Sequence, residues 1–80
     1  SFIAFQNENK NIEIQAVFSG AGEAYLIDTR GRTIEQISFL SSDRSGLQFE
    51  FQTTNLSEGI YFVKIKSGNA LLGQKVQVVK

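Results

Sequence analysis

The chain has 80 residues, a formal net charge of zero, and neither cysteine nor histidine. Disulfides are therefore excluded, as are the usual zinc and copper sites, which draw their ligands from these two residue types. Acidic and basic residues are interspersed without a block of like charge, so the electrostatic signature of a nucleic-acid-binding protein is missing.

This length predicts one small domain, residues 1–80, held together by packing alone. We expect the seven phenylalanines and two tyrosines to form the bulk of its core. No apolar run approaches the roughly 20 residues of a membrane-spanning helix, so we expect no transmembrane segment. The N-terminus lacks a signal-peptide pattern, but such a leader would begin a longer precursor, and we expect the chain to be a fragment of one.

The first two predicted strands cover residues 2–5 and 12–18. The polar residues 6–11 between them predict a turn. In the second strand alternate residues are apolar, as expected when one face is buried: Ile12, Ile14, Ala16 and Phe18. Residues 19–22 contain two glycines and predict a flexible reversal of the chain.

A third strand is predicted over residues 23–29. It is apolar on both faces, so we expect it to be central in its sheet. Residues 28–32 then predict a hairpin turn. Gly31 can take a positive φ there, and Asp28 can accept hydrogen bonds from backbone N–H groups ahead of it.

The fourth predicted strand, residues 33–40, changes the phase of its apolar residues once. This change predicts either a β-bulge near residues 35–36 or a strand that turns over its end. Residues 41–46 are polar and predict a loop, and residues 47–52 predict a half-exposed strand. The apolar face of that strand consists of Leu47, Phe49 and Phe51.

Two further strands end the chain. Residues 56–59 predict a turn, with Gly59 at a positive φ, and a strand follows over residues 60–66. One face of that strand carries Tyr61, Val63 and Ile65, and the other carries Phe62, Lys64 and Lys66. Residues 67–69 reverse the chain into a strand that runs from residue 71 to the last residue, with Val76 and Val78 on its apolar face. We expect the connecting loop to be longer than two residues.

Seven short strands separated by turn signals predict an all-β fold, an Ig-like antiparallel β-sandwich. A small barrel is the alternative. Because proline is absent, the edge strands need charge for protection, and the candidates are Lys64, Lys66 and Lys75. Unpaired edges also allow an edge-to-edge or swapped homodimer.

The residues favour no catalytic chemistry. A Ser-His-Asp mechanism needs a histidine, which this chain lacks. Four glutamates, Glu13, Glu23, Glu35 and Glu50, fall on predicted polar strand faces, where solubility is the simpler explanation. The polar residues 7–11 are a faint calcium pattern, but a solvated turn explains them better. We therefore expect no enzyme, no catalytic residue, no metal and no cofactor.

Three separated segments resemble one family: Asp-Thr-Arg-Gly-Arg at 28–32, Leu-Ser-Glu-Gly-Ile-Tyr-Phe-Val-Lys-Ile at 56–65, and Lys-Val-Gln-Val-Val-Lys at 75–80. They are similar to the C-terminal sorting domain of the type IX secretion system, the Por secretion tail, over about residues 12–80. That family has a D-x-x-G-R turn, an L-x-x-G-x-Y-x-V-x-[VI] strand and a final lysine-bearing strand. Two departures occur. Residues 5–8 replace a Tyr-Pro-Asn-Pro-like opening, and Ser57 stands where proline is frequent.

The resemblance implies a non-catalytic C-terminal signal that carries an N-terminal cargo domain through the periplasm to the cell surface or medium of a Gram-negative bacterium. Its partners would be the type IX translocon or shuttle proteins and a sortase-like peptidase that removes the domain. The residues that carry the resemblance are Gly31, Leu56, Gly59, Tyr61, Lys75 and Lys80.

Local structure explains some of these residues better than direct recognition does. Positive φ accounts for Gly31 and Gly59, and burial accounts for Tyr61. A solvent-facing charge contributes little to folding, so Lys75 and Lys80 are the stronger candidates for recognition. The edge of the last strand could also pair with a receptor strand.

Two other functions stay open. The chain could be an Ig-like accessory module that remains on a surface protein and binds a glycan or protein through exposed Phe62. It could also be a plain structural spacer. The resemblance favours the sorting signal over both.

Overall fold

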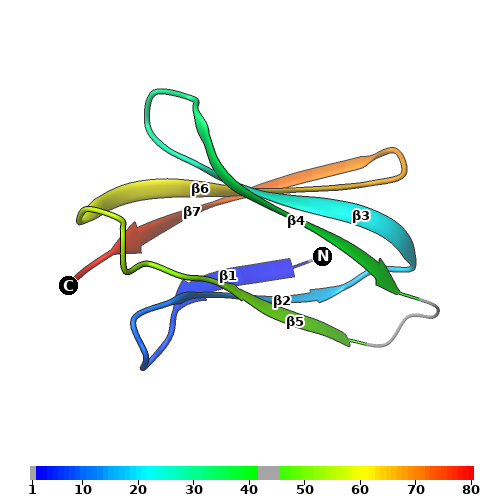
Figure 1. The fold of residues 1–80 in the computed structure, drawn as a ribbon. Coiled ribbons are helices and arrows are strands. Elements are labelled where there is room, and N and C mark those ends of the chain that lie inside the picture. The colour runs from blue at the N-terminus through cyan, green and yellow to red at the C-terminus, as the bar shows by residue number, and fades with distance from the viewer. Residues whose placement is uncertain (1, 42–45) are drawn as a thin grey trace.

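A computed structural model describes residues 2–41 and 46–80. Seven strands form two antiparallel sheets that face each other, one ordered β1-β2-β5 and the other β4-β3-β6-β7 (Figure 1). The strands are β1 (Phe2–Gln6), β2 (Ile12–Val17), β3 (Gly20–Ile27), β4 (Thr33–Ser41), β5 (Gly46–Phe51), β6 (Gly59–Ser67) and β7 (Ala70–Val78). The predicted Ig-like sandwich is confirmed, and the barrel alternative is not.

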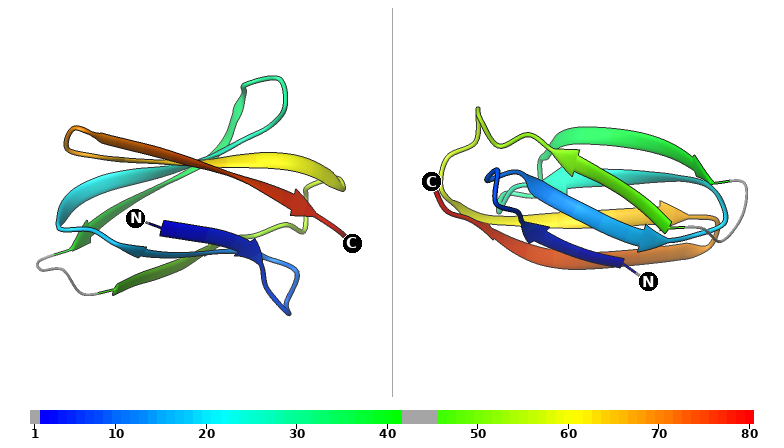
Figure 2. Two further views of the ribbon diagram at one scale, coloured as in Figure 1. Left: turned by 180° about the vertical axis from the view of Figure 1, so that it is seen from behind. Right: turned by 90° about the horizontal axis from the view of Figure 1, so that it is seen from below.

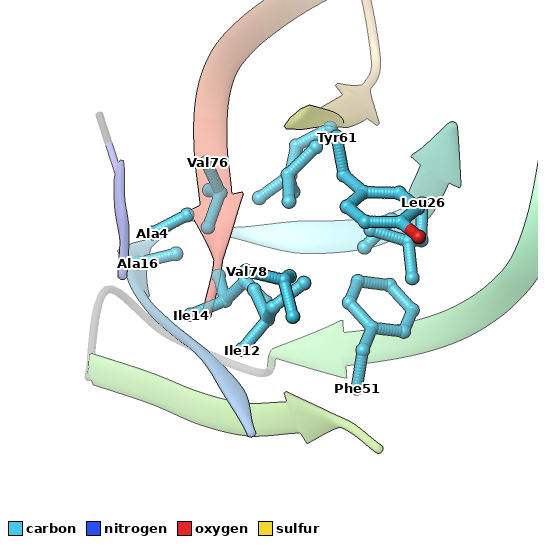
Figure 3. Close-up of a cluster of buried hydrophobic side chains, with 12 residues drawn as sticks. Ala4, Ile12, Ile14, Ala16, Leu26, Phe51, Tyr61, Val76 and Val78 are labelled. Atoms are coloured by element: carbon cyan, nitrogen blue, oxygen red, sulfur yellow. The ribbon is translucent and has the colours of Figure 1, made fainter. Parts of the chain in front are cut away.

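The core lies between the sheets and follows the predicted alternation (Figure 3). Every second residue of β6 points inward, and β3 is central in its sheet, as its two apolar faces predict. The buried apolar residues are Ala4, Ile12, Ile14, Ala16, Ala24, Leu26, Phe51, Tyr61, Val63, Ile65, Val76 and Val78. Aliphatic side chains dominate this set. The expectation of a mainly aromatic core is therefore wrong.

The other phenylalanines lie at the margins of the core. Four rings form a continuous series in which neighbouring ring centroids are 6.0–6.4 Å apart: Phe18, Phe39, Phe49 and Phe51. Phe39 lies on β4 and Phe49 on β5, so the series joins the edges of the two sheets. On the outer surfaces, Phe5 is 37% exposed and Phe62 is 38% exposed. Aromatic side chains thus close one side of the sandwich more than they fill its centre.

The reversal predicted at residues 19–22 is wrong in extent. β3 already begins at Gly20, and residues 20–22 pair with residues 39–41 of β4. The reversal occurs just before Gly20, which has a φ of +93°. Gly22 is a paired strand residue that lies beneath the ring of Phe39. The glycine is needed there for close packing and not for a turn.

Two other local predictions have mixed outcomes. Leu26 pairs with Glu35 and Ile27 with Thr33, so Ile34 is the extra residue of a bulge, one position before the predicted place. The loop between β6 and β7 is shorter than predicted. Ser67 pairs with Ala70, which leaves a two-residue turn. Gly68 in that turn has a φ of +59°, the left-handed conformation that such short turns require.

The edges also differ from the prediction. Lys64 and Lys66 lie on β6, which is between β3 and β7, so they protect no edge. Lys75 is on the edge strand β7, which ends at Val78 and not at the last residue. A loop was predicted at residues 41–46. Residue 41 instead ends β4 and residue 46 begins β5, and residues 42–45 lie outside the described residues.

Substitution of Gly22 by alanine tests the close packing. A Cβ at this position would overlap the ring of Phe39 and lie 2.8 Å from the carbonyl oxygen of Lys66. We expect Gly22→Ala to lower the free energy of unfolding by about 1–3 kcal/mol, measured by urea denaturation. Gly73→Ala is the matched control, because its Cβ would make ordinary contacts at 3.8 and 3.9 Å. Equal stability of the two variants would contradict the packing role of Gly22.

Candidate functional site

The turn between β3 and β4 is organised by the carboxylate of Asp28. Its Oδ1 accepts hydrogen bonds from the backbone N–H groups of Arg30 (2.9 Å) and Arg32 (3.0 Å). Its Oδ2 accepts from Arg32 Nε at 2.9 Å. Gly31 has a φ of +82°, and its N–H donates to the carbonyl oxygen of Asp28. The predicted turn chemistry is confirmed for both Asp28 and Gly31.

These bonds also set the charge of the turn. The backbone N–H of Arg32 contributes most to lowering the pKa of Asp28, with further contributions from the Arg32 side chain and the Arg30 N–H. Partial desolvation opposes them. The Arg32 side chain is 71% exposed, although its Nε is bound to Asp28. The turn therefore holds an arginine in a fixed direction while its outer guanidinium edge faces solvent.

The second motif forms the loop that leads into β6. The hydroxyl of Tyr61 donates to the carbonyl oxygen of Ser57 at 2.7 Å, and its ring belongs to the core. Leu56 packs against the same core, and its N–H donates to the Thr53 carbonyl oxygen. Gly59 has a φ of +148°, which an L-residue rarely adopts. Each motif residue thus has a local structural role.

The C-terminal residue is anchored to this loop. Lys80 Nζ donates to the carbonyl oxygens of Thr53 (2.6 Å) and Thr54 (3.4 Å), and its backbone N–H donates to Glu58 Oε2 at 3.2 Å. Lys80 is exposed, as expected, but its ammonium group also binds these loop carbonyls. Lys75 is exposed on the outer face of the larger sheet, where it pairs with Phe62.

The three motif segments meet at one end of the sandwich (Figure 1). The turn between β3 and β4 and the loop before β6 line a cleft of about 530 Å³, and Leu56, Gly59 and Tyr61 lie in its wall. A neighbouring hollow of about 510 Å³ on the outer sheet face includes Gly31 and Lys75. Lys80 reaches this end through Glu58, which also lines the cleft. All six residues singled out from the sequence therefore gather around two adjoining depressions.

The sequence matches a known family of protein domains. The family described as "Secretion system C-terminal sorting domain" matches residues 3–80. The chain belongs to this family. No curated protein and no solved structure matches it.

The family assignment sets the broad role of this sorting domain. Domains of this kind are C-terminal signals for type IX secretion, which implies attachment to an N-terminal cargo and export to the cell surface or the extracellular space. Signal domains of this family are in general non-catalytic. Within residues 2–41 and 46–80, no helix is long and apolar enough to cross a membrane.

The glutamates were expected to be ordinary solvated residues, and Glu13 is not. It lies directly opposite Glu50 on β5, and Asn7 Nδ2 donates to both carboxylates, at 3.2 and 2.7 Å. Gln15 and Gln48 each donate to Glu13 Oε2 at 2.8 Å, so the side chain is only 9% exposed. The bond from Gln15 is the main cause that lowers the pKa of Glu13. A lowered pKa suits a structural carboxylate and not a general acid.

Sequence reasoning missed several residues of this end of the molecule. Arg30, Arg32 and Glu58 line the cleft, yet they stood out only as letters within motifs. Their positions within the motifs could have indicated that they lie on the same surface, because both motifs contain turns, and turns hold neighbouring side chains in fixed directions. The glutamines Gln6 and Gln74, described below, carried no signal in the sequence.

The pH dependence of stability tests the Asp28 turn. Because the folded pKa lies below the ordinary value of 3.8, Asp28 adds stability that is complete above that value. This contribution is lost as the pH falls from 3.8 through the lower folded pKa. We expect Asp28→Asn to be less stable than the wild type at neutral pH, with a gap that closes in acid. Urea unfolding at a series of pH values measures the gap, and a gap independent of pH would contradict this role.

The two C-terminal lysines should differ in their effects on stability. Lys80→Ala removes hydrogen bonds to two loop carbonyls, so we expect a loss of about 0.5–1.5 kcal/mol in the free energy of unfolding. Lys75→Ala removes an exposed charge and should change stability by less than about 0.5 kcal/mol. Thermal and urea unfolding of both variants would measure the difference. Identical behaviour of the two lysines would show that the Lys80 contacts contribute nothing.

Proposed function

We propose that the domain is a sorting signal that the type IX translocon or its shuttle protein reads at the motif end of the sandwich. The motif end comprises the cleft walls at residues 28–34 and 55–61, the adjoining hollow and the C-terminal residue. The family match carries the proposal. Its structural support is that three segments far apart in the sequence build a single surface.

Two kinds of residue contribute to this surface. Gly31, Leu56, Gly59 and Tyr61 shape it through backbone conformation and packing. Lys75 offers a charge that no described fold contact requires, beside the partly exposed ring of Phe62. The phenylalanine ring is of a type that is enriched at protein interfaces. We therefore assign direct recognition first to Lys75, and anchoring of the C-terminus to Lys80.

The finer steps of export follow from the same assignment. The cargo domain would precede residue 1 and supply the activity of the whole protein. The cargo and its signal would cross the periplasm and then the outer membrane. A sortase-like peptidase would then remove the domain, which makes the domain a substrate of that enzyme. The domain itself would need no cofactor.

A second candidate function rests on the hollow on the outer sheet face. Ile27, Phe62 and Gly73 provide an apolar surface there, and Lys64 and Lys75 lie at its border. Such a surface could bind a glycan or another protein if the module stays on the mature product. This alternative predicts that the domain remains attached to its cargo after export.

An export assay tests the proposed function. A reporter fused to residues 1–80 should leave a cell that has type IX secretion, and periplasmic retention of that fusion would contradict the sorting role. Removal of residues 75–80 is a poor test, because it also removes two buried core residues, Val76 and Val78.

Point variants give the sharper comparison. We expect Lys75→Gln to lower the secreted fraction by about tenfold, because it removes one charge contact with the partner. Thermal stability should not change. Lys66→Gln is the matched control on the same outer face, where Lys66 pairs with Leu71 away from the motif end. Equal secretion of both variants would remove Lys75 from the recognition surface.

A further inference from the structure

The two sheets are joined along one side by a reciprocal pair of glutamines. Gln74 of β7 accepts from the N–H of Ala4 and donates to its carbonyl oxygen, both at 3.0 Å. Gln6 of β1 accepts from the N–H of Val79 at 2.9 Å and donates to its carbonyl oxygen at 2.8 Å. β1 and β7 belong to different sheets, so these side-chain amides link two edge strands. We call this row of contacts the glutamine seam.

The glutamine seam imitates strand pairing. A glutamine amide has one N–H side and one C=O side, as a peptide group has, and each glutamine binds both main-chain groups of one residue on the other strand. Ala4 faces Gln74 and Gln6 faces Val79, so the numbering increases in the same direction on both strands, and β1 runs parallel to β7 (Figure 2). The seam therefore marks a place where a polypeptide strand would fit beside β7.

The geometry also shows which main-chain groups of β7 face this side. The N–H and C=O of Val79 bind Gln6 and not β6. In an antiparallel pair, alternate residues direct both groups to the same side, so Gln77, Lys75 and Gly73 direct theirs to the outer edge as well. Lys75 is thus both a candidate recognition residue and a member of the edge that β1 flanks.

We propose that the glutamine seam is the binding site for an extended β-strand of the export machinery, which takes the place of β1 beside β7. The proposal rests on the sorting function proposed above and adds how the last strand is read. An incoming strand would satisfy the outward main-chain groups of β7 directly, and its side chains would lie beside those of Lys75 and Gln77. Until then β1 covers the edge, which protects the domain from unwanted strand pairing.

β1 is suited to leave because it contributes little to the core. All five of its residues are described, and of them Ala4 alone is buried, whereas Ile3 is 53% exposed and Phe5 is 37% exposed. By comparison, β6 buries three larger side chains. In the turn that follows β1, Lys10 has a φ of +70°, a conformation that disfavours residues other than glycine. Displacement of β1 would give up the packing of Ala4 and Phe2 and its pairing with β2, which the contacts of the incoming strand with β7 would have to offset.

The chemistry of the seam favours a peptide strand over other ligands. Departure of β1 would free the side-chain amide of Gln74 and the main-chain N–H and C=O of Val79, which its residues now bind. Together with the outward main-chain groups of Gly73, Lys75 and Gln77, these form a row of peptide-like donors and acceptors. The apolar hollow that Lys75 borders lies on the outer sheet face, whereas this row of main-chain groups lies along the strand edge and suits a peptide strand. A second copy of this chain could also supply such a strand, and the experiment below separates that case.

Hydrogen exchange on the 80-residue chain is the first test. The backbone amides of Ile3 and Phe5 on β1 pair with β2. We expect them to exchange faster, through a local opening of lower free energy, than the amides of Leu26 and Val63 in the other sheet. Gln74→Met keeps the side-chain length but removes both bonds to Ala4, so it should accelerate exchange in β1 and leave Leu26, which does not pair with residue 74, unchanged. Protection of β1 equal to that of the central strands would overturn the proposal.

A designed disulfide provides the functional test. The chain has no cysteine, so Ile3→Cys with Gln15→Cys would form a single bond that ties β1 to β2 in the periplasm. Gln15→Cys with Gln48→Cys is the matched control, because it ties β2 to β5, which need not separate. We expect the first lock to lower the secreted fraction of a reporter fusion by about tenfold and the second to leave it unchanged.

Each outcome is decisive. If the β1–β2 lock is secreted as well as the control, the proposal fails and the sorting function stands. If the unlocked fusion is not secreted, the sorting function fails and the proposal fails with it. If the Ile3→Cys, Gln15→Cys variant runs as a disulfide-linked dimer on a non-reducing gel, the strand that replaces β1 comes from a second copy of the chain. The proposed partner is then wrong.

Discussion

The side chain of Tyr61 connects the core of the sandwich with its functional end. Its ring packs with Phe51 and Leu26 in the buried cluster, and its hydroxyl binds the carbonyl oxygen of Ser57 (Figure 3). Together with the packing of Leu56, this contact ties the loop before β6 to the core, and that loop in turn holds the ammonium group of Lys80. The motif end depends on these anchors, because a loop without them would give the cleft no fixed wall.

The two sides of the sandwich are closed by different physical means. Phenylalanine rings join β4 to β5, whereas glutamine amides join β1 to β7. Apolar contact of large rings is lost only with substantial exposure to water, but amide bonds can be exchanged for those of another strand at little net cost. In the proposed strand exchange, this asymmetry would let the domain stay closed on the aromatic side while the glutamine side opens.

The residues that carry the family resemblance contribute shape more than reactive groups. Gly31 and Gly59 provide positive φ angles, and Asp28 holds its turn through its carboxylate. Glu13, opposite Glu50, is likewise held by side-chain amides, which lower its pKa. In the described residues, turns and packing thus give the motif end its shape.

The sequence by itself determined the strands, their buried faces and the turns at Gly31 and Gly59, because period-two burial and positive φ are local properties. Only the tertiary structure decided what depends on distant neighbours. Gly22 serves close packing because Phe39 lies over it, and Glu13 gains the amide of Gln48 because β5 lies alongside β2. The glutamine seam joins positions 70 or more residues apart, so no local pattern could reveal it.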